Sequence, residues 1–187
     1  MIFHILDIGR KGGSHMNRIK KDIQFPKQVF LIMIVVLTTV YANTQIFMLT
    51  YIPSGSMMPT VNIHNFVLGT RQNLEKIERY DIVIFRFPDD ETQYYIKRVI
   101  GLPGEDIEIV DGIVYADGVR LIDDFVMEIS NDSGEYHVPE DHYFMLGDNR
   151  NNSKDSRFWD KNYVMKDKIC AKAVSIIYPL CDFKILN

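Results

Sequence analysis

The chain has 187 residues, of which 47% are hydrophobic and 25% charged, a composition typical of a folded protein and not of a disordered one. Its formal net charge of −4 at pH 7 excludes the overall attraction to nucleic acid that a strongly basic chain would have. The charges are unevenly distributed, because residues 1–27 contain six Lys/Arg and two acidic residues, whereas residues 28–70 contain no Asp, Glu, Lys or Arg.

Residues 28–50 are predicted to form a transmembrane anchor. The apolar run over 29–49 is 21 residues long, enough for a helix rising about 1.5 Å per residue to cross the hydrocarbon core. By the positive-inside rule, the basic segment 1–27 lies in the cytoplasm and residues 51–187 form a domain on the extracytoplasmic face. The GSHM at 13–16 resembles a cloning scar, so residues 1–15 are left out of the fold prediction.

A cleaved secretory signal is the alternative interpretation of this segment. Val40-Tyr41-Ala42 resembles a cleavage site, with aliphatic or small residues at positions −3 and −1. A retained anchor is favoured because the apolar run resumes after Ala42.

The segment beyond the anchor is predicted to be mostly β. Alternating and β-branched runs favour strands, and the Asp-Gly pairs at 111–112 and 117–118 favour hairpin turns. Strands are expected over 81–88, 94–104, 106–121, 143–149 and 173–180, and short helices over 73–79 and 151–158.

Histidine and cysteine patterns predict neither a metal site nor a disulfide framework. The five histidines form no HExxH-like ligand pair, and nothing around them indicates a His-dependent catalytic triad. Cys170 and Cys181 are expected to be free or buried thiols, and a pairing between them is left open.

Ser56 is a candidate nucleophile in the stretch PSGSMMPT at 53–60. Gly55 permits an unusual backbone geometry, and Pro53 and Pro59 stiffen the two ends of the loop. A rigid loop that presents a hydroxyl suits a nucleophile, but serine also needs a nearby base. Taken alone, the stretch is more typical of a plain turn.

Lys97 is a candidate base in the apolar stretch YYIKRVIGLPG at 94–104. If its side chain points inward, loss of solvent lowers its pKa, and the neutral amine can take a proton from Ser56. Strand alternation predicts that either Lys97 or Arg98 faces inward, and we expect Arg98 on the opposite face to be solvated. The alternative is an edge lysine that reaches to water.

The stretch GDNRNNSKDSRFW at 147–159 is dense in polar side chains directly after a predicted strand. Such side chains bond to one another and to the backbone, and so hold a loop in one shape. Asp155 and Arg157 are expected to form an ion pair, and Ser153 could orient a lysine amine. A solvated polar loop is the alternative.

Four stretches follow the apolar segment in a fixed order, namely PSGSMMPT, DIVIFRFP, YYIKRVIGLPGE and GDNRNNSKDSRFW. In this combination the chain resembles the type I signal peptidases. These are membrane-bound serine proteases that remove signal peptides from exported proteins. The resemblance covers most of residues 28–175 and is closest to the compact form typical of Gram-positive bacteria. It implies a compact, mostly β catalytic domain behind one N-terminal transmembrane helix, with an apolar surface on the membrane. The family pattern is lost after Trp159, where DKNYVMKDKIC follows.

The resemblance also implies residue roles. Ser56 matches the nucleophile and Lys97 the general base, while the Ser56 N–H and the Ser54 hydroxyl match the oxyanion hole. Ser153 matches the serine that hydrogen-bonds the catalytic lysine. The supporting positions are Ser153, Asp155, Arg157, Asp148 and Arg98. The shallow pockets for small −1 and −3 side chains of the substrate match Ile52, Pro53, Met57, Tyr95 and Ile96.

No metal or cofactor is implied. The implied partners are exported preproteins and the lipid bilayer, with no nucleic acid, and the oligomeric state is open. The alternatives are a Ser-Lys protease dedicated to pilin or conjugation substrates, a self-cleaving repressor-type protease, and a non-catalytic membrane-anchored β domain. Intact Ser56 and Lys97 argue against the last. A further hypothesis is that the enzyme cuts its own chain after Ala42.

Overall fold

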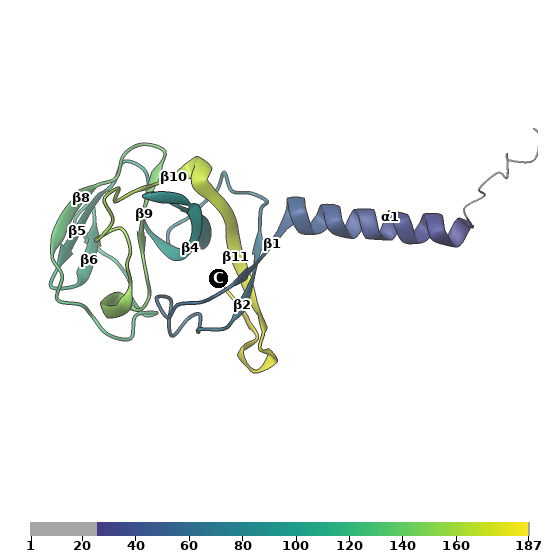
Figure 1. Cartoon of the computed structure of the whole chain (residues 1–187). Coiled ribbons are helices and arrows are strands. Elements are labelled where there is room, and N and C mark those ends of the chain that lie inside the picture. The colour runs from purple at the N-terminus through teal and green to yellow at the C-terminus, as the bar shows by residue number, and fades with distance from the viewer. Residues whose placement is uncertain (1–25, 187) are drawn as a thin grey trace, which may run out of the picture. The chain divides into compact units, whose positions relative to one another are not determined.

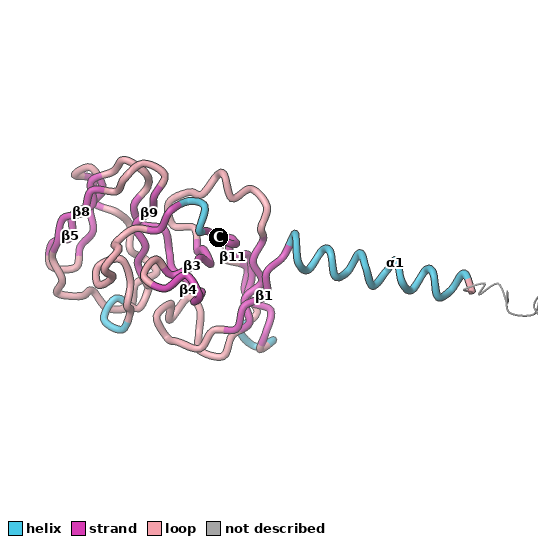
Figure 2. Tube along the Cα trace, turned by 45° about the horizontal axis from the view of Figure 1, so that its top comes forward, coloured by secondary structure: helices cyan, strands magenta, loops and turns pink. Residues whose placement is uncertain are grey.

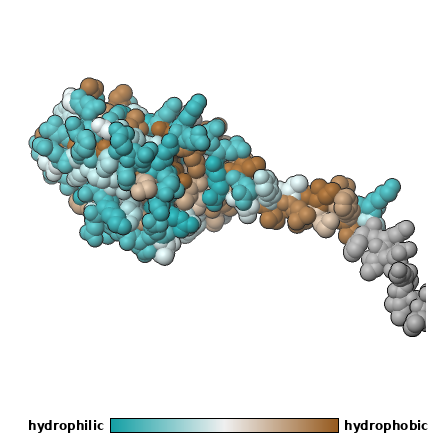
Figure 3. Space-filling view, turned by 90° about the horizontal axis from the view of Figure 1, so that it is seen from above, coloured by the Kyte–Doolittle hydropathy of each residue, from teal (hydrophilic) through white to brown (hydrophobic). Residues whose placement is uncertain are grey.

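The structure, a computed structural model, describes residues 26–186 and divides into a helical unit that ends at Thr39 and a β unit that begins at Val40 (Figure 1). The expected cytoplasmic segment, including the GSHM at 13–16, lies almost wholly outside the described residues. Helix α1 spans Lys27–Tyr41 and continues as a π-helical segment, Ala42–Ile46. None of the α1 side chains is buried, and Figure 3 shows their apolar character in brown. Over Lys27–Ile46 the helix is long and apolar enough to cross a membrane, a test that a signal sequence also passes.

The helix ends before the predicted anchor does. Strand β1 spans Phe47–Tyr51, so the last four residues of the expected anchor belong to a strand. The apolar residues after Ile46 are strand residues, because their backbone pairs antiparallel with β2, Phe66–Thr70. An apolar run can continue from a helix into a strand, so hydrophobicity alone does not mark the end of the helix.

The β unit contains two antiparallel sheets. The larger has the order β1-β2-β11-β3-β4-β9-β10, and β12 also pairs with β11. Its further strands are β3 (Ile82–Phe87), β4 (Asp90–Gly101), β9 (His142–Leu146), β10 (Val164–Met165), β11 (Ile169–Tyr178) and β12 (Lys184–Ile185). The smaller has the order β7-β6-β5-β8 and consists of β5 (Asp106–Val110), β6 (Ile113–Ala116), β7 (Val119–Arg120) and β8 (Gly134–His137). Figures 1 and 2 show β5 and β8 at the end of this unit opposite β1.

The five predicted strand regions are confirmed, and so are the two hairpin turns. Asp111 and Gly112 have φ of 49° and 79°, and Asp117 and Gly118 have φ of 48° and 76°. Two successive residues with positive φ form the tight turn that matches strand twist, and Asp-Gly is favoured there. These turns set the register of β5, β6 and β7.

The two predicted short helices are not formed as α-helices. Residues 73–79 are turns and irregular backbone, and Asn73 has a φ of 58°, which a right-handed helix does not accommodate. In 151–158 only a 3₁₀ turn forms, Arg150–Asn152. The Ser156 N–H, which in a helix over this range would donate to the Asn152 carbonyl, donates to the Met145 carbonyl instead.

Strand β4 is covered on both faces, which decides the surroundings of its two basic residues. On one face Ile96, together with its neighbour Ile84 on β3, packs into a cluster with Ile52 and Met57. The other face contributes to a second cluster, in which Val99 packs with Val83, Phe85, Met145 and Trp159. As a result every residue of β4 from Ile96 onward is buried.

Candidate active site

Ser56 and Lys97 are brought together from segments 41 residues apart. Ser56 lies on the loop between β1 and β2, and Lys97 lies on β4. The distance from Lys97 Nζ to Ser56 Oγ is 2.7 Å, and Nζ also donates to the Ile96 carbonyl at 3.1 Å. Ser56 is 6% exposed and Lys97 4%, so the pair is almost removed from water.

Burial changes the acidity of the Lys97 amine. Loss of solvent lowers the pKa of Lys97 from 10.5 to about 8, against the opposing attraction of Asp155 and Asp148. Lys97 forms no ion pair with any carboxylate in the part of the chain that the structure describes. The amine is therefore half neutral near pH 8, and a neutral amine beside a hydroxyl is able to take its proton.

Two contacts from one asparagine hold the Ser56 loop in place. The Asn149 N–H donates to the Ser56 carbonyl at 3.1 Å, and Asn149 Nδ2 donates to the Gly55 carbonyl at 3.0 Å. Sequence reasoning did not single out Asn149, although it lies in the polar stretch 147–159. Gly147, nearby, has to be glycine because a Cβ there would collide with Ser153 Oγ and with the Ser56 carbonyl.

The Ser54 hydroxyl lies next to the Ser56 hydroxyl. Ser54 Oγ is 3.5 Å from Ser56 Oγ, and Ser54 is exposed to solvent whereas Ser56 is buried. A hydroxyl at this position is close enough to reach an oxygen that forms on a carbon bonded to Ser56 Oγ.

Arg98 is buried, so the prediction that it stays solvated is wrong. It is 4% exposed, and its Nε and Nη2 donate to the two carboxylate oxygens of Asp148 at 2.8 and 2.6 Å. Its Nη1 donates to the Tyr80 carbonyl at 2.8 Å, and its guanidinium carbon lies 4.0 Å from the centroid of the Phe125 ring. The prediction from alternating side chains assumes that one face of the strand is exposed to water, but both faces of β4 are covered here.

The expected ion pair between Asp155 and Arg157 is present. Arg157 Nε and Nη2 donate to the carboxylate oxygens of Asp155 at 2.8 and 2.9 Å, and Asp155 is fully buried. Because Asp155 also accepts from the Gly147 N–H, it ties the polar loop to the end of β9. The hydrogen bond expected between Ser153 and Lys97 is not formed, since the buried Ser153 hydroxyl has no hydrogen-bond partner in the structure.

A cleft of about 430 Å³ contains both Ser56 and Lys97. Four of the expected pocket residues line it, namely Ile52, Pro53, Tyr95 and Ile96. Met57 does not, because it is fully buried in the core beneath the loop. Residues that sequence reasoning missed complete the walls; they are Thr50, Tyr51, Gln93, Tyr94, Asn152 and Lys154.

Two strand edges are open at this cleft. Strand β1 is the last strand of the larger sheet and pairs only with β2. In β4 the pairing with β9 begins at Arg98, so the segment before it pairs only with β3. Unpaired backbone groups at a sheet edge can bind an extended peptide as an additional strand.

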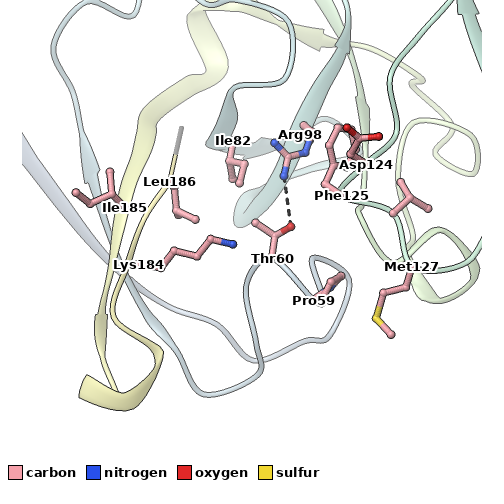
Figure 4. Close-up of a pocket in the computed structure, with 11 residues that line it drawn as sticks. Pro59, Thr60, Ile82, Arg98, Asp124, Phe125, Met127, Lys184, Ile185 and Leu186 are labelled. Carbon is pink, nitrogen blue, oxygen red and sulfur yellow. Dashed lines mark hydrogen bonds between the residues drawn. The ribbon is translucent and has the colours of Figure 1, made fainter.

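A larger cavity of about 630 Å³ contains neither Ser56 nor Lys97. Figure 4 shows it between β12 and the loop at Phe125, with Thr60 and Arg98 facing each other at 3.5 Å. Its charged residues are Arg98, which is paired with Asp148, together with Asp124 and the exposed Lys184, and none of its described residues makes a contact between a hydroxyl and a buried lysine amine like that of the cleft. The smaller cleft is therefore the candidate active site.

Within residues 26–186, no group of three or more His, Cys, Asp or Glu side chains is placed to hold a metal ion. Cys170 is half-buried and Cys181 is exposed, and both are free thiols, as expected.

Comparisons with known proteins place the chain in a family. The family model described as "Signal peptidase, peptidase S26" matches residues 25–178. A probable signal peptidase I-2 from Synechocystis is 36% identical over 139 residues, which cover 70% of this chain and 62% of that protein. Signal peptidase I S from Bacillus subtilis is 29% identical over 172 residues, which cover 83% of this chain and 90% of that protein. A solved signal peptidase I from Enterococcus faecalis is 33% identical, with a TM-score of 0.47 over 52% of this chain and 96% of that chain.

Proposed function

This chain belongs to the signal peptidase family, and on that basis we propose that it is a membrane-anchored serine endopeptidase that removes N-terminal signal peptides from exported preproteins. The matched region includes every residue of the cleft. The observation that carries the proposal is the 2.7 Å contact between Ser56 Oγ and a buried Lys97 amine whose pKa is lowered to about 8.

The first chemical step is acylation of Ser56. Neutral Lys97 Nζ removes the Ser56 proton while Ser56 Oγ bonds to the carbonyl carbon of the residue before the scissile bond. A tetrahedral intermediate forms with negative charge on the former carbonyl oxygen. The ammonium of Lys97 then gives its proton to the leaving amine, the C–N bond breaks, and an acyl-enzyme remains.

The second step is hydrolysis of the acyl-enzyme. Lys97, neutral again, takes a proton from water, and the resulting oxygen nucleophile attacks the ester carbon. Collapse of the second intermediate breaks the ester bond and returns the proton to Ser56 Oγ. The products are the signal peptide with a new carboxyl end and the mature protein with a new amino end.

The oxyanion is stabilised next to Ser54. The Ser56 N–H and the Ser54 hydroxyl are the proposed donors, and the 3.5 Å separation of the two hydroxyls supports the second of these. One such donor is typically worth on the order of 10²–10³ in rate.

The substrate binds as an extended chain along the open edges of β1 and β4. Small side chains at −1 and −3 enter the shallow space next to Ile52, Pro53, Tyr95 and Ile96. This geometry also bears on cutting after Ala42. Tyr41 is the last residue of α1 and Ala42 begins the π-helical segment, so self-cleavage requires that stretch to unwind first.

The apolar helix over Lys27–Ile46 anchors the enzyme in the cell membrane, with the basic N-terminus in the cytoplasm and the β unit on the extracytoplasmic face. Preproteins and the lipid bilayer are then its partners. In this location the enzyme meets the cleavage region of a signal peptide where it leaves the membrane.

Cleavage of a preprotein peptide tests the proposal. The full-length chain in detergent is compared with Ser56→Ala and Lys97→Ala, using a peptide with Ala at −3 and −1. Wild type is expected to cut after the second Ala, and both variants are expected to be inactive while folded. Ser133→Ala and Lys76→Ala are matched controls outside the cleft and should remain active. An inactive wild type, or an active Lys97→Ala, would contradict the proposal.

A further inference from the structure

The walls of the active-site cleft carry positive charge and no negative charge. None of the residues that line the cleft is acidic, and two of them are lysines, Lys97 and Lys154. In the reactive form Lys97 is neutral, so Lys154 is then the remaining charged group on these walls. The proposed mechanism does not use it.

Lys154 has no partner that would neutralise it. It is exposed and makes no hydrogen bond or ion pair with another residue in the described range 26–186. Its Nζ lies 5.8 Å from the centroid of the Phe87 ring. Phe87 stacks on Tyr95 with the ring centroids 4.4 Å apart, and Lys97 Nζ lies 5.4 Å from the centroid of Tyr95. The two amines therefore contact the two rings of one stacked pair.

Two carboxylates beside the cleft already have hydrogen-bond partners other than Lys154. Asp155, the next residue, is fully buried and is paired with Arg157. Asp90 accepts hydrogen bonds from Thr92 and from the cleft residue Gln93. A carboxylate for Lys154 would therefore have to come from outside these residues.

We propose that Lys154 is a specificity residue that selects substrates with Asp or Glu close to the scissile bond. The inference rests on the proposed function. Lys154 and Ser56 line the same cleft, and an extended substrate advances about 3.3 Å per residue, so a side chain only a few residues from the scissile bond can reach Lys154. Since the −1 and −3 side chains are small, the acidic residue occupies one of the other positions.

The expected effect is small and depends on salt. An ion pair at an exposed rim changes affinity by about two- to fivefold at low ionic strength. At 1 M salt the screening length falls to about 3 Å, so the preference should almost vanish. An effect of this size appears in KM, because the same contact exists before and during the reaction.

The test is a charge scan of the substrate. A peptide with Ala at −3 and −1 is varied at each other position from −5 to +4 with Glu, Gln or Lys, and kcat/KM is measured with the full-length chain in detergent. Wild type should favour Glu over Gln by about two- to fivefold at one position or two neighbouring positions. Lys154→Arg should keep the preference, and Lys154→Glu should favour Lys at the same position.

Each enzyme is compared with itself on the three peptides, so any common change in the reactivity of Lys97 cancels. Lys76→Glu is the matched control, because it makes the same change in net charge outside the cleft and should keep the wild-type ratio. Equal rates on all charges, or a preference that survives in Lys154→Glu, would overturn the inference and leave the peptidase intact. Failure of wild type to cut any peptide would overturn the proposed function and this inference with it.

Discussion

The two faces of strand β4 give its two neighbouring basic residues opposite surroundings. Arg98 and Lys97 are both 4% exposed. Arg98 faces the buried Asp148 carboxylate and remains an ion pair. Lys97 faces a hydroxyl and a carbonyl, and burial lowers its pKa to about 8. A buried cation with a carboxylate partner stays charged and supports the structure, whereas one without a partner loses its proton more readily and is able to act as the proposed base.

The largest expected effect is on catalysis. Lys97→Met removes the base while keeping an apolar side chain of similar length, and kcat/KM should fall by about 10⁴-fold. The measurement is peptide cleavage by the full-length variant, with circular dichroism to confirm that it is folded. If the variant keeps more than about a tenth of wild-type activity, Lys97 is not the base.

Removing the neighbouring cation should instead damage the fold. Arg98→Met leaves the fully buried Asp148 carboxylate unpaired, which should lower the free energy of unfolding by about 3–5 kcal/mol. Chemical denaturation measures this change. The double variant with Asp148→Asn should recover part of the loss, and a single variant as stable as wild type would contradict the assigned role of the pair.

The pH dependence of activity should follow Lys97. Because its pKa is about 8 and the neutral amine is the reactive form, kcat/KM should rise tenfold per pH unit at low pH and level off above about pH 8. At pH 6 the rate should be about 100-fold below the plateau. A profile already flat at pH 6 would mean that another group controls the reaction.

The lowered pKa of Lys97 also affects the stability of the fold. The unfolded chain has the higher lysine pKa, so below pH 8 the folded state carries the full cost of a buried ammonium, and above pH 10.5 that cost disappears. Lys97→Met should therefore be more stable than wild type at pH 7, by about 3 kcal/mol, and the gain should shrink as the pH rises from 8 to 10.5. Thermal unfolding at both ends of this range tests the sign.

The contact between Ser56 and Lys97 could be expected only once the family resemblance joined two local patterns, a stiff Gly-Ser loop and a lysine in an apolar strand. Each pattern alone is more typical of a structural role. The hairpins at Asp111 and Asp117 followed from turn chemistry. The surroundings of Arg98 were not predictable, since alternation along one strand does not reveal that loops cover both faces. The Ser153 hydroxyl has no hydrogen-bond partner in the structure, and the contacts of Asn149 depend on the approach of two distant loops, so neither has a local sequence signal.

Direct titration of Lys97 tests the central claim, which is that burial without a carboxylate partner makes this lysine a base. The ε-carbon of Lys97 can be followed by NMR in the full-length chain with labelled lysine, and its signal assigned by its absence in Lys97→Met. The account predicts a midpoint near pH 8. A midpoint of about 10 or higher, the range of an ordinary lysine, would contradict it.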